Sequence, residues 1–442
     1  MTHFNKVLIG AVSIGLSVLY AVNTQAATTT INPGTNTFTD AITSAMTAGD
    51  ILELTPGDYI LDGDPCSAPR IPEGVTVRGM GANISDVKVI RKTATGCGQF
   101  VVIQPLGPFP TGVRGIVENI AFSRSADDST AEPLASLARL VINNCTFDGN
   151  NIANGVSIAG SELNGVEVMN MSATGTKGAV RSDDPPTSLI YDTYIHDNAS
   201  RGIFTKVQID VNMSRIVNNG SRGIDVDSGV PVSITDSIIA LNSEGIFSVG
   251  DLTIQGCTIY GNTGGGVTMY GAGGTITDSI VADNGATGIE GSGTSDYNDA
   301  FHNGGGSGCA GWGGVAPGAN DLIGTPYNFC SFPGVDPVFE SVDPTNACFL
   351  ALSSGTPAEV LQGSSTGSYI GAVDVCPPTC IACAELETQY LDDVCDQLDT
   401  NPPTSMKEYQ ALAATLAQSL VDGATVCGEA AACVTHLVGL NP

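Results

Sequence analysis

Apolar residues recur between residues 140 and 292 with a spacing of about 20–24 residues. Apolar and polar positions alternate within each repeat and no helical period runs through it, so the pattern predicts short β-strands. Two apolar positions, five residues apart, mark each of the seven repeats: Ile142 and Phe147, Val166 and Met171, Ile190 and Ile195, Val211 and Ile216, Ile234 and Ile239, Ile254 and Ile259, Ile276 and Val281.

An asparagine and a glycine follow these apolar positions at nearly fixed offsets. Asparagine tolerates left-handed φ and its amide can pair with the asparagine of the next repeat, while glycine suits a strand start where a side chain would clash. The asparagine column is Asn150, Thr174, Asn198, Asn219, Asn242, Asn262 and Asn284, and the glycine column is Gly155, Gly178, Gly202, Gly223, Gly245, Gly266 and Gly288. Strands this short can pair fully only by stacking coil on coil, about 4.8 Å apart. The pattern therefore predicts an all-β fold, a right-handed parallel β-helix.

Two cysteines stand at a position that most repeats fill with a small residue. Cys145 and Cys257 take the place of serine or threonine at the corner, three residues after the first apolar position. They lie five turns apart, about 24 Å, which is too far for a disulfide. We therefore expect both thiols to be free and buried.

The two ends of the chain differ from the repeats. Residues 1–26 have the positive start, apolar run and small terminal residues of a secretory signal peptide. Residues 27–375 are assigned to the β-helix, with an N-terminal capping helix over 39–48. Residues 376–442 carry two amphipathic helical patterns and six cysteines, which predicts a disulfide-linked helical hairpin.

Composition and charge narrow the possible partners. The 442 residues include 16 Lys and Arg but 45 Asp and Glu, a formal charge of −29. Such an acidic chain disfavours nucleic acid and anionic membranes as partners. No apolar run after the signal peptide approaches the roughly 20 residues of a membrane span. We expect a secreted protein located in the periplasm, at the cell surface or outside the cell.

Both ends of the proposed coil resemble a known family. The N-terminal matches are Asp40-Ala41-Ile42, Ala48–Leu54, Pro56–Tyr59 and Gly74–Gly79, and the C-terminal matches are Asp336–Phe339, Phe349-Leu350 and Gly371-Ala372. Together they resemble extracellular pectin-lyase-like β-helix repeat proteins with a choice-of-anchor type of closing segment. The chain departs from that pattern at Tyr369 and around Thr356-Pro357. The resemblance implies the fold and secretion, but this superfamily contains lyases, hydrolases, epimerases and non-enzymatic surface proteins.

Counting from each glycine gives the side chains that point outward from the following strand. Three features share this face: a stack of cations (Lys177, Arg201 and Arg222), two aspartates on one strand with a lysine beside them (Asp225, Asp227 and Lys206), and flanking aromatic rings (Phe204, Phe247 and Tyr270). By the same count Arg181 falls on the inward side, which puts the register near Asp183 and Asp184 in question.

Two functions fit this face, and the sequence leaves open whether the chain is an enzyme. A polysaccharide lyase would need a base and a group that neutralises a uronate carboxylate, and Lys206, Arg201 and Arg222 are the candidates. Lys177 and the three rings would bind the acidic polysaccharide, and Ca²⁺ could be held by Asp225, Asp227, Asp183 and Asp184. The alternative is an ion-pair lattice on a non-catalytic surface protein that binds glycans or proteins. Glycoside hydrolysis ranks lower because the polygalacturonase motifs are absent. The scattered histidines do not predict a metal site, and we expect His196 to lie on the surface.

Overall fold

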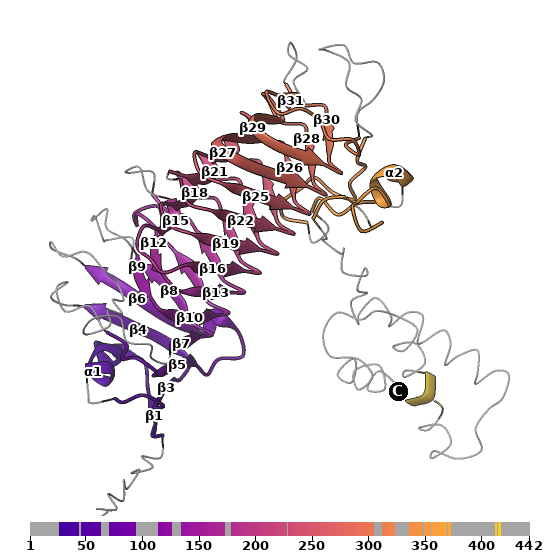
Figure 1. The fold of residues 1–442 in the computed structure, drawn as a ribbon. Coiled ribbons are helices and arrows are strands. Elements are labelled where there is room, and N and C mark those ends of the chain that lie inside the picture. The colour runs from indigo at the N-terminus through magenta and orange to yellow at the C-terminus, as the bar shows by residue number, and fades with distance from the viewer. Residues whose placement is uncertain are drawn as a thin grey trace, which may run out of the picture.

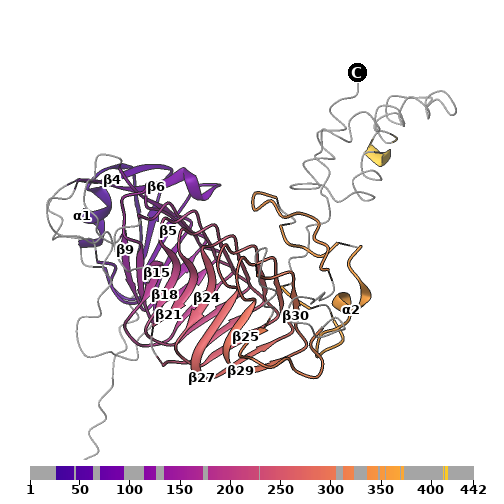
Figure 2. The ribbon, with the colours of Figure 1, turned by 90° about the horizontal axis from the view of Figure 1, so that it is seen from above.

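Parallel strands stack along the length of a β-solenoid (Figures 1 and 2). The computed structural model describes residues 26–43, 46–62, 70–93, 114–125, 134–172, 178–227, 229–304, 312–322, 336–346, 349–353, 355–368, 370–372, 412 and 414–416. The predicted signal peptide falls almost wholly outside these residues, as do Lys177 and all but four residues of the predicted Cys-rich hairpin. No helix in the described ranges is long and apolar enough to cross a membrane.

The strands form three ladders, two of which merge at β27 and β29 into a 19-stranded sheet, while the third is a 12-stranded sheet. The first ladder contains β9 (Ala135–Ala138), β12 (Val156–Ala159), β15 (Gly178–Ser182), β18 (Arg201–Thr205), β21 (Arg222–Val226), β24 (Glu244–Ser248), β27 (Val267–Thr277), β29 (Ile289–Asp296) and β31 (Trp312–Gly313). The second contains β1 (Thr28–Ile31), β3 (Ile51–Leu54), β5 (Thr76–Gly79), β7 (Gly115–Glu118), β10 (Leu140–Asn143), β13 (Glu162–Asn164), β16 (Ser188–Tyr191), β19 (Ile209–Asn212), β22 (Val232–Thr235) and β25 (Leu252–Gln255), followed by β27 and β29. The third contains β2 (Gly34–Thr35), β4 (Gly57–Asp62), β6 (Val87–Thr93), β8 (Ala121–Arg124), β11 (Thr146–Asp148), β14 (Glu167–Met169), β17 (Tyr194–His196), β20 (Arg215–Val217), β23 (Ile238–Ala240), β26 (Thr258–Tyr260), β28 (Ile280–Ala282) and β30 (Asp299–Phe301).

The predicted apolar columns form the core from β16 onward. Ile190 pairs with Val211, which pairs with Ile234, and all three are buried. One earlier turn was misaligned by three residues. There Leu163 and Val168 take the column positions that we assigned to Val166 and Met171. The error is possible because all four side chains are apolar and buried.

Buried asparagines form a ladder along one corner. Each side-chain amide except the last donates to the Oδ1 of the next asparagine at 2.8–3.2 Å; the ladder comprises Asn198, Asn219, Asn242, Asn262, Asn284 and Asn303. The left-handed φ belongs to the residue before the ladder position, for example Asn218 at 54°, and not to the ladder asparagine itself. The predicted clash at the glycine column is confirmed, because a Cβ on Gly223 would lie 2.7 Å from Ile239 Cγ2.

Short helices and the C-terminal segment pack against the coil. The helix α1 (Thr37–Thr43) begins before the predicted range and buries Phe38 and Ile42; that it caps the coil remains a prediction. The 3₁₀ helix η2 (Ile84–Asp86) precedes β6. The C-terminal segment, with α2 (Ala358–Leu361), covers the third ladder: Phe349 and Leu350 pack with Ile238, while Val360 packs with Ile280.

His196 is buried in the third ladder, although its sequence setting predicted a surface residue. Its Nδ1 lies 2.8 Å from Asp197 Oδ2 and its Nε2 lies 3.0 Å from Glu167 Oε1. Only the protonated imidazolium can donate to both carboxylates at once. Burial alone lowers the pKa of His196, but the hydrogen bonds that it donates to Glu167 and Asp197 raise its pKa above the ordinary 6.5.

The first prediction concerns the two corner cysteines, which are free and buried as expected. Burial raises the pKa of both thiols to about 12, so almost no thiolate exists near neutral pH. Iodoacetamide should therefore leave Cys145 and Cys257 unmodified in the folded protein and should alkylate both in urea. Peptide mass spectrometry measures this, and rapid native modification of either cysteine would contradict the burial.

The second prediction concerns His196. Because its pKa is raised in the folded state, the stability it contributes is fully present below pH 6.5 and is lost as the pH rises through the raised value. Urea unfolding from about pH 6 upward should show the wild type losing stability more steeply than His196→Gln. Parallel curves of unfolding free energy against pH for the two proteins would mean that the contacts of His196 with Glu167 and Asp197 do not contribute to stability.

Candidate functional site

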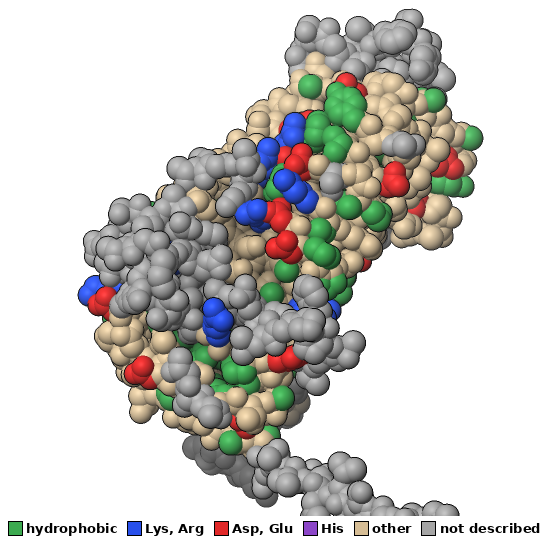
Figure 3. Space-filling model, turned by 60° about the vertical axis from the view of Figure 1, so that its left-hand side comes forward, with side chains coloured by type: hydrophobic (Ala, Val, Ile, Leu, Met, Phe, Trp, Pro, Cys, Tyr) green, Lys and Arg blue, Asp and Glu red, His purple; other side chains and the backbone are tan. Residues whose placement is uncertain are grey.

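Neighbouring turns of the first ladder bring charged and aromatic side chains onto one face. Strand pairing aligns Arg181 with Phe204, Phe204 with Asp225, Asp225 with Phe247, and Phe247 with Thr268. The outward side chains from β15 to β27 define what we call the cation–aromatic face: Arg181, Asp183, Arg201, Phe204, Lys206, Arg222, Asp225, Asp227, Glu244, Phe247 and Tyr270. Figure 3 shows a band of Lys or Arg and Asp or Glu side chains with hydrophobic side chains beside it.

The predicted register is wrong by one residue in β15. Gly178 pairs with Arg201 and not with Gly202, so Val180 turns into the core and Arg181 faces outward. Gly178 therefore takes the place beside Arg201 that we had assigned to Lys177, which lies outside the described residues.

Asp225 is the central carboxylate of the face. It is only 3% exposed and forms ion pairs with Arg201 Nε through Oδ2 and with Arg222 Nη1 through Oδ1, the latter at 3.1 Å. Arg222 Nε also lies 2.8 Å from Glu244 Oε2. Burial raises the pKa of Asp225, and the two arginines oppose that rise. The two arginines of the predicted cation stack are thus neutralised by carboxylates of the same sheet.

Lys206 and Asp227 form an outer and weaker pair. The Lys206 Nζ lies 3.5 Å from Asp227 Oδ2, and about half of each side chain is exposed (49% and 56%). The ammonium also lies 5.5 Å from the centre of the Phe204 ring. Lys206 is therefore in contact with solvent and with a ring at the same time.

The three rings differ in how much of their surface is open. Phe204 is 6% exposed, because the long side chains of Arg201 and Lys206 lie over it. The Arg222 guanidinium covers Phe247, 3.6 Å from the ring centre. Tyr270 meets Phe247 edge to face at 5.7 Å and is 59% exposed, so it offers the most ring surface to a ligand.

The four aspartates proposed for Ca²⁺ are distributed among different partners. Asp183 forms an ion pair with Arg181, Asp225 is held by two arginines, and Asp227 pairs with Lys206. Asp184 is exposed. Over the described ranges, no group of three or more His, Cys, Asp or Glu side chains is placed to hold a metal ion. The chemistry that this face presents is that of paired charges and one open ring.

Two members of this lattice escaped the sequence analysis. Glu244 was not among the predicted site residues, although its position one repeat after Arg222 was a usable signal. Arg181 was placed inward because the count started from the wrong residue.

The third prediction separates the inner carboxylate from the outer one. Asp225→Asn leaves two arginines without their shared counter-charge and should destabilise the protein by about 1–3 kcal/mol. Asp227→Asn removes an exposed pair and should change stability by less than about 0.5 kcal/mol. Denaturant unfolding of both variants at one pH tests this, and equal losses would contradict the central place of Asp225.

Comparisons with known proteins find two distant structural likenesses. No family model matches the chain, and no curated protein matches it in sequence. Among solved structures, the chain is similar to pectate lyase Pel9A, at 12% identity over 79% of this chain and 97% of that chain, with a TM-score of 0.41. It is also similar to the A-module of the mannuronan C-5 epimerase AlgE4 from Azotobacter vinelandii, at 13% identity over 64% of this chain and 94% of that chain, with a TM-score of 0.29. These likenesses concern the parallel β-solenoid; they give no support to the anchor-type closing segment.

Proposed function

We propose that this is a secreted glycan-binding protein whose cation–aromatic face takes a uronate-containing polysaccharide. One observation carries the proposal: an exposed ammonium on Lys206 and an exposed ring on Tyr270 share a face of an otherwise acidic chain. Three strand steps, about 14 Å, separate their turns, so a chain of several sugars would be needed to reach both.

Each partner suits one part of an acidic sugar. An ammonium forms charge-assisted hydrogen bonds with a carboxylate, and the face of a tyrosine ring packs against the C–H face of a sugar. The inner ion pairs support this surface, because Asp225 fixes Arg201 and Arg222 over the rings beside the binding groups. The ligand therefore meets a surface that is already ordered.

The finer hypothesis is β-elimination on the same surface. The Lys206 amine would take the proton next to the uronate carboxylate, a carbon–carbon double bond would form, and the bond to the leaving oxygen would break, with water protonating that oxygen. The Lys206 amine already contacts the Asp227 carboxylate, and both arginines already face Asp225. The geometry thus supports binding better than elimination.

The fourth prediction tests binding by titration calorimetry with oligogalacturonate, oligomannuronate and a glycosaminoglycan, with dextran as the neutral reference. Tyr270→Ala and Lys206→Ala should each weaken the binding of an acidic probe roughly threefold to tenfold. The Lys206 effect should shrink at high salt because the contact is exposed.

Matched controls lie elsewhere on the coil. Tyr191→Ala removes another exposed tyrosine and Lys88→Ala another exposed lysine, and both should bind like the wild type. If no acidic probe binds, the proposed function fails. Ultraviolet absorbance from a new double bond, lost in Lys206→Ala, would establish elimination in addition to binding.

A further inference from the structure

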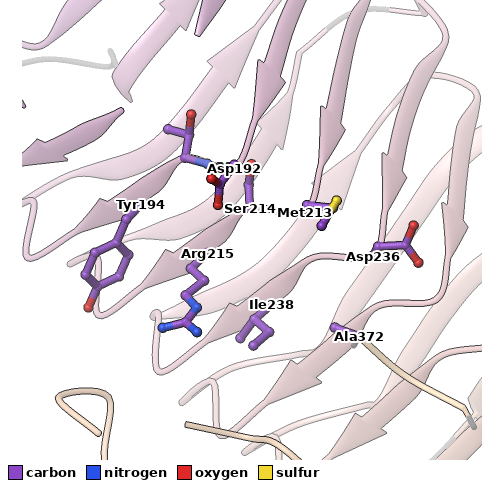
Figure 4. A pocket seen from close by; sticks show the side chains of 9 residues that line it. Asp192, Tyr194, Met213, Ser214, Arg215, Asp236, Ile238 and Ala372 are labelled. Atoms are coloured by element: carbon purple, nitrogen blue, oxygen red, sulfur yellow. Dashed lines mark hydrogen bonds between the residues drawn. The ribbon is translucent and has the colours of Figure 1, made fainter. Parts of the chain in front are cut away.

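A pocket of about 270 Å³ lies away from the cation–aromatic face, at the corner between the second and third ladders. Three consecutive turns build it, and the C-terminal segment closes it with Ala372. Figure 4 shows its lining side chains: Asp192, Thr193, Tyr194, Met213, Ser214, Arg215, Asp236, Ile238 and Ala372.

Two columns of side chains form the walls. Strand pairing aligns Tyr194 with Arg215 and Arg215 with Ile238 along β17, β20 and β23. Asp192, Met213 and Asp236 occupy the matching corner positions of the same turns, and each has a left-handed φ of 46–48°. The sharp corner therefore repeats three times and sets the side chains of Asp192, Met213 and Asp236 opposite the strand column.

The Tyr194 ring is held in place by the neighbouring His196 ring. It stacks on the His196 ring with centroids 3.9 Å apart. Both nitrogens of that imidazole are in turn hydrogen-bonded, to Glu167 and Asp197. An aromatic wall supported in this way loses little conformational entropy when a ligand packs against it.

The carboxylates of the corner column are available to a ligand. Within the part of the chain that the structure describes, neither Asp192 nor Asp236 has a side-chain hydrogen-bond or ion-pair partner, and both are exposed. Arg215, between Tyr194 and Ile238, adds a guanidinium to the same cavity. Acceptors and donors thus converge beside an aromatic and aliphatic wall, which is the usual composition of a small-ligand site.

We propose that this pocket binds one neutral pyranose ring of a glycan. Sugar hydroxyls can donate to Asp192 and Asp236 and accept from Arg215, while the C–H face packs on Tyr194. Two carboxylates against one guanidinium disfavour a uronate, and Arg215 beside the tyrosine disfavours a cation. The volume lies just below the lower end, about 300 Å³, of typical ligand pockets, so one ring fits and a longer segment does not.

The fifth prediction uses saturation-transfer NMR on the full chain with methyl glucoside, methyl galactoside and methyl mannoside. Galacturonate and ethanolamine serve as the charged probes. At least one neutral glycoside should receive saturation on its ring protons. Tyr194→Ala should weaken its binding about tenfold or more, while Tyr194→Phe keeps the ring and should bind normally. Asp192→Asn should weaken binding roughly threefold to tenfold.

A second variant guards against a folding defect in Tyr194→Ala. Met213 is 51% exposed at the corner, so Met213→Trp should block the cavity without disturbing the core. Tyr191→Ala lies outside the pocket and should retain binding. The proposal is overturned if no neutral glycoside receives saturation, if binding survives in Met213→Trp, or if a charged probe binds more tightly than every neutral one.

Discussion

The register between consecutive coils is the constraint on which everything else in this molecule depends. Each turn donates its backbone N–H groups to the turn before or after it, so a side chain is aligned with residues about 20 positions away in the sequence. Arg222 meets Glu244 and Asn219 meets Asn242 for this reason alone. Because successive side chains alternate between the two faces of a strand, a shift of one residue would exchange core and surface along a whole strand.

The sequence was sufficient to predict the coil because its apolar columns are regular from β16 onward. It failed at the turn that contains β13 and β14. Leu163, Val166, Val168 and Met171 are all apolar and all buried, so a shift of three residues still placed an apolar side chain inward at each column position. Only a corner residue could have fixed the alignment there. Met171 occupies the position that the later turns fill with a ladder asparagine, so this turn lacks the asparagine that would have revealed its register.

The composition of the cation–aromatic face was also predictable, but its pairing was not. Alternation placed Asp225, Phe204 and Arg222 outward, and that is correct. A one-dimensional count cannot show that long arginine and lysine side chains lie flat across neighbouring strands, cover Phe204 and bury Asp225. The pocket could not be predicted from the sequence for a related reason, because Ala372, which lines it, comes from a segment more than 100 residues later in the chain.

The two candidate surfaces are built from the same repeat but offer opposite chemistry. On the first ladder, cations and carboxylates occupy neighbouring turns of one flat sheet, so they neutralise one another and leave few groups open. At the corner, the left-handed turns place Asp192 and Asp236 two turns apart with Met213 between them, and among the described residues neither carboxylate has a side-chain partner. Their carboxylates consequently remain open. On a flat ladder the charged side chains pair with one another, and a ligand must compete with those ion pairs. At a sharp corner the carboxylates of Asp192 and Asp236 stay unpaired beside the fixed Tyr194 ring. Ligand contacts on this solenoid are thus determined by local backbone curvature as much as by the residues in each column.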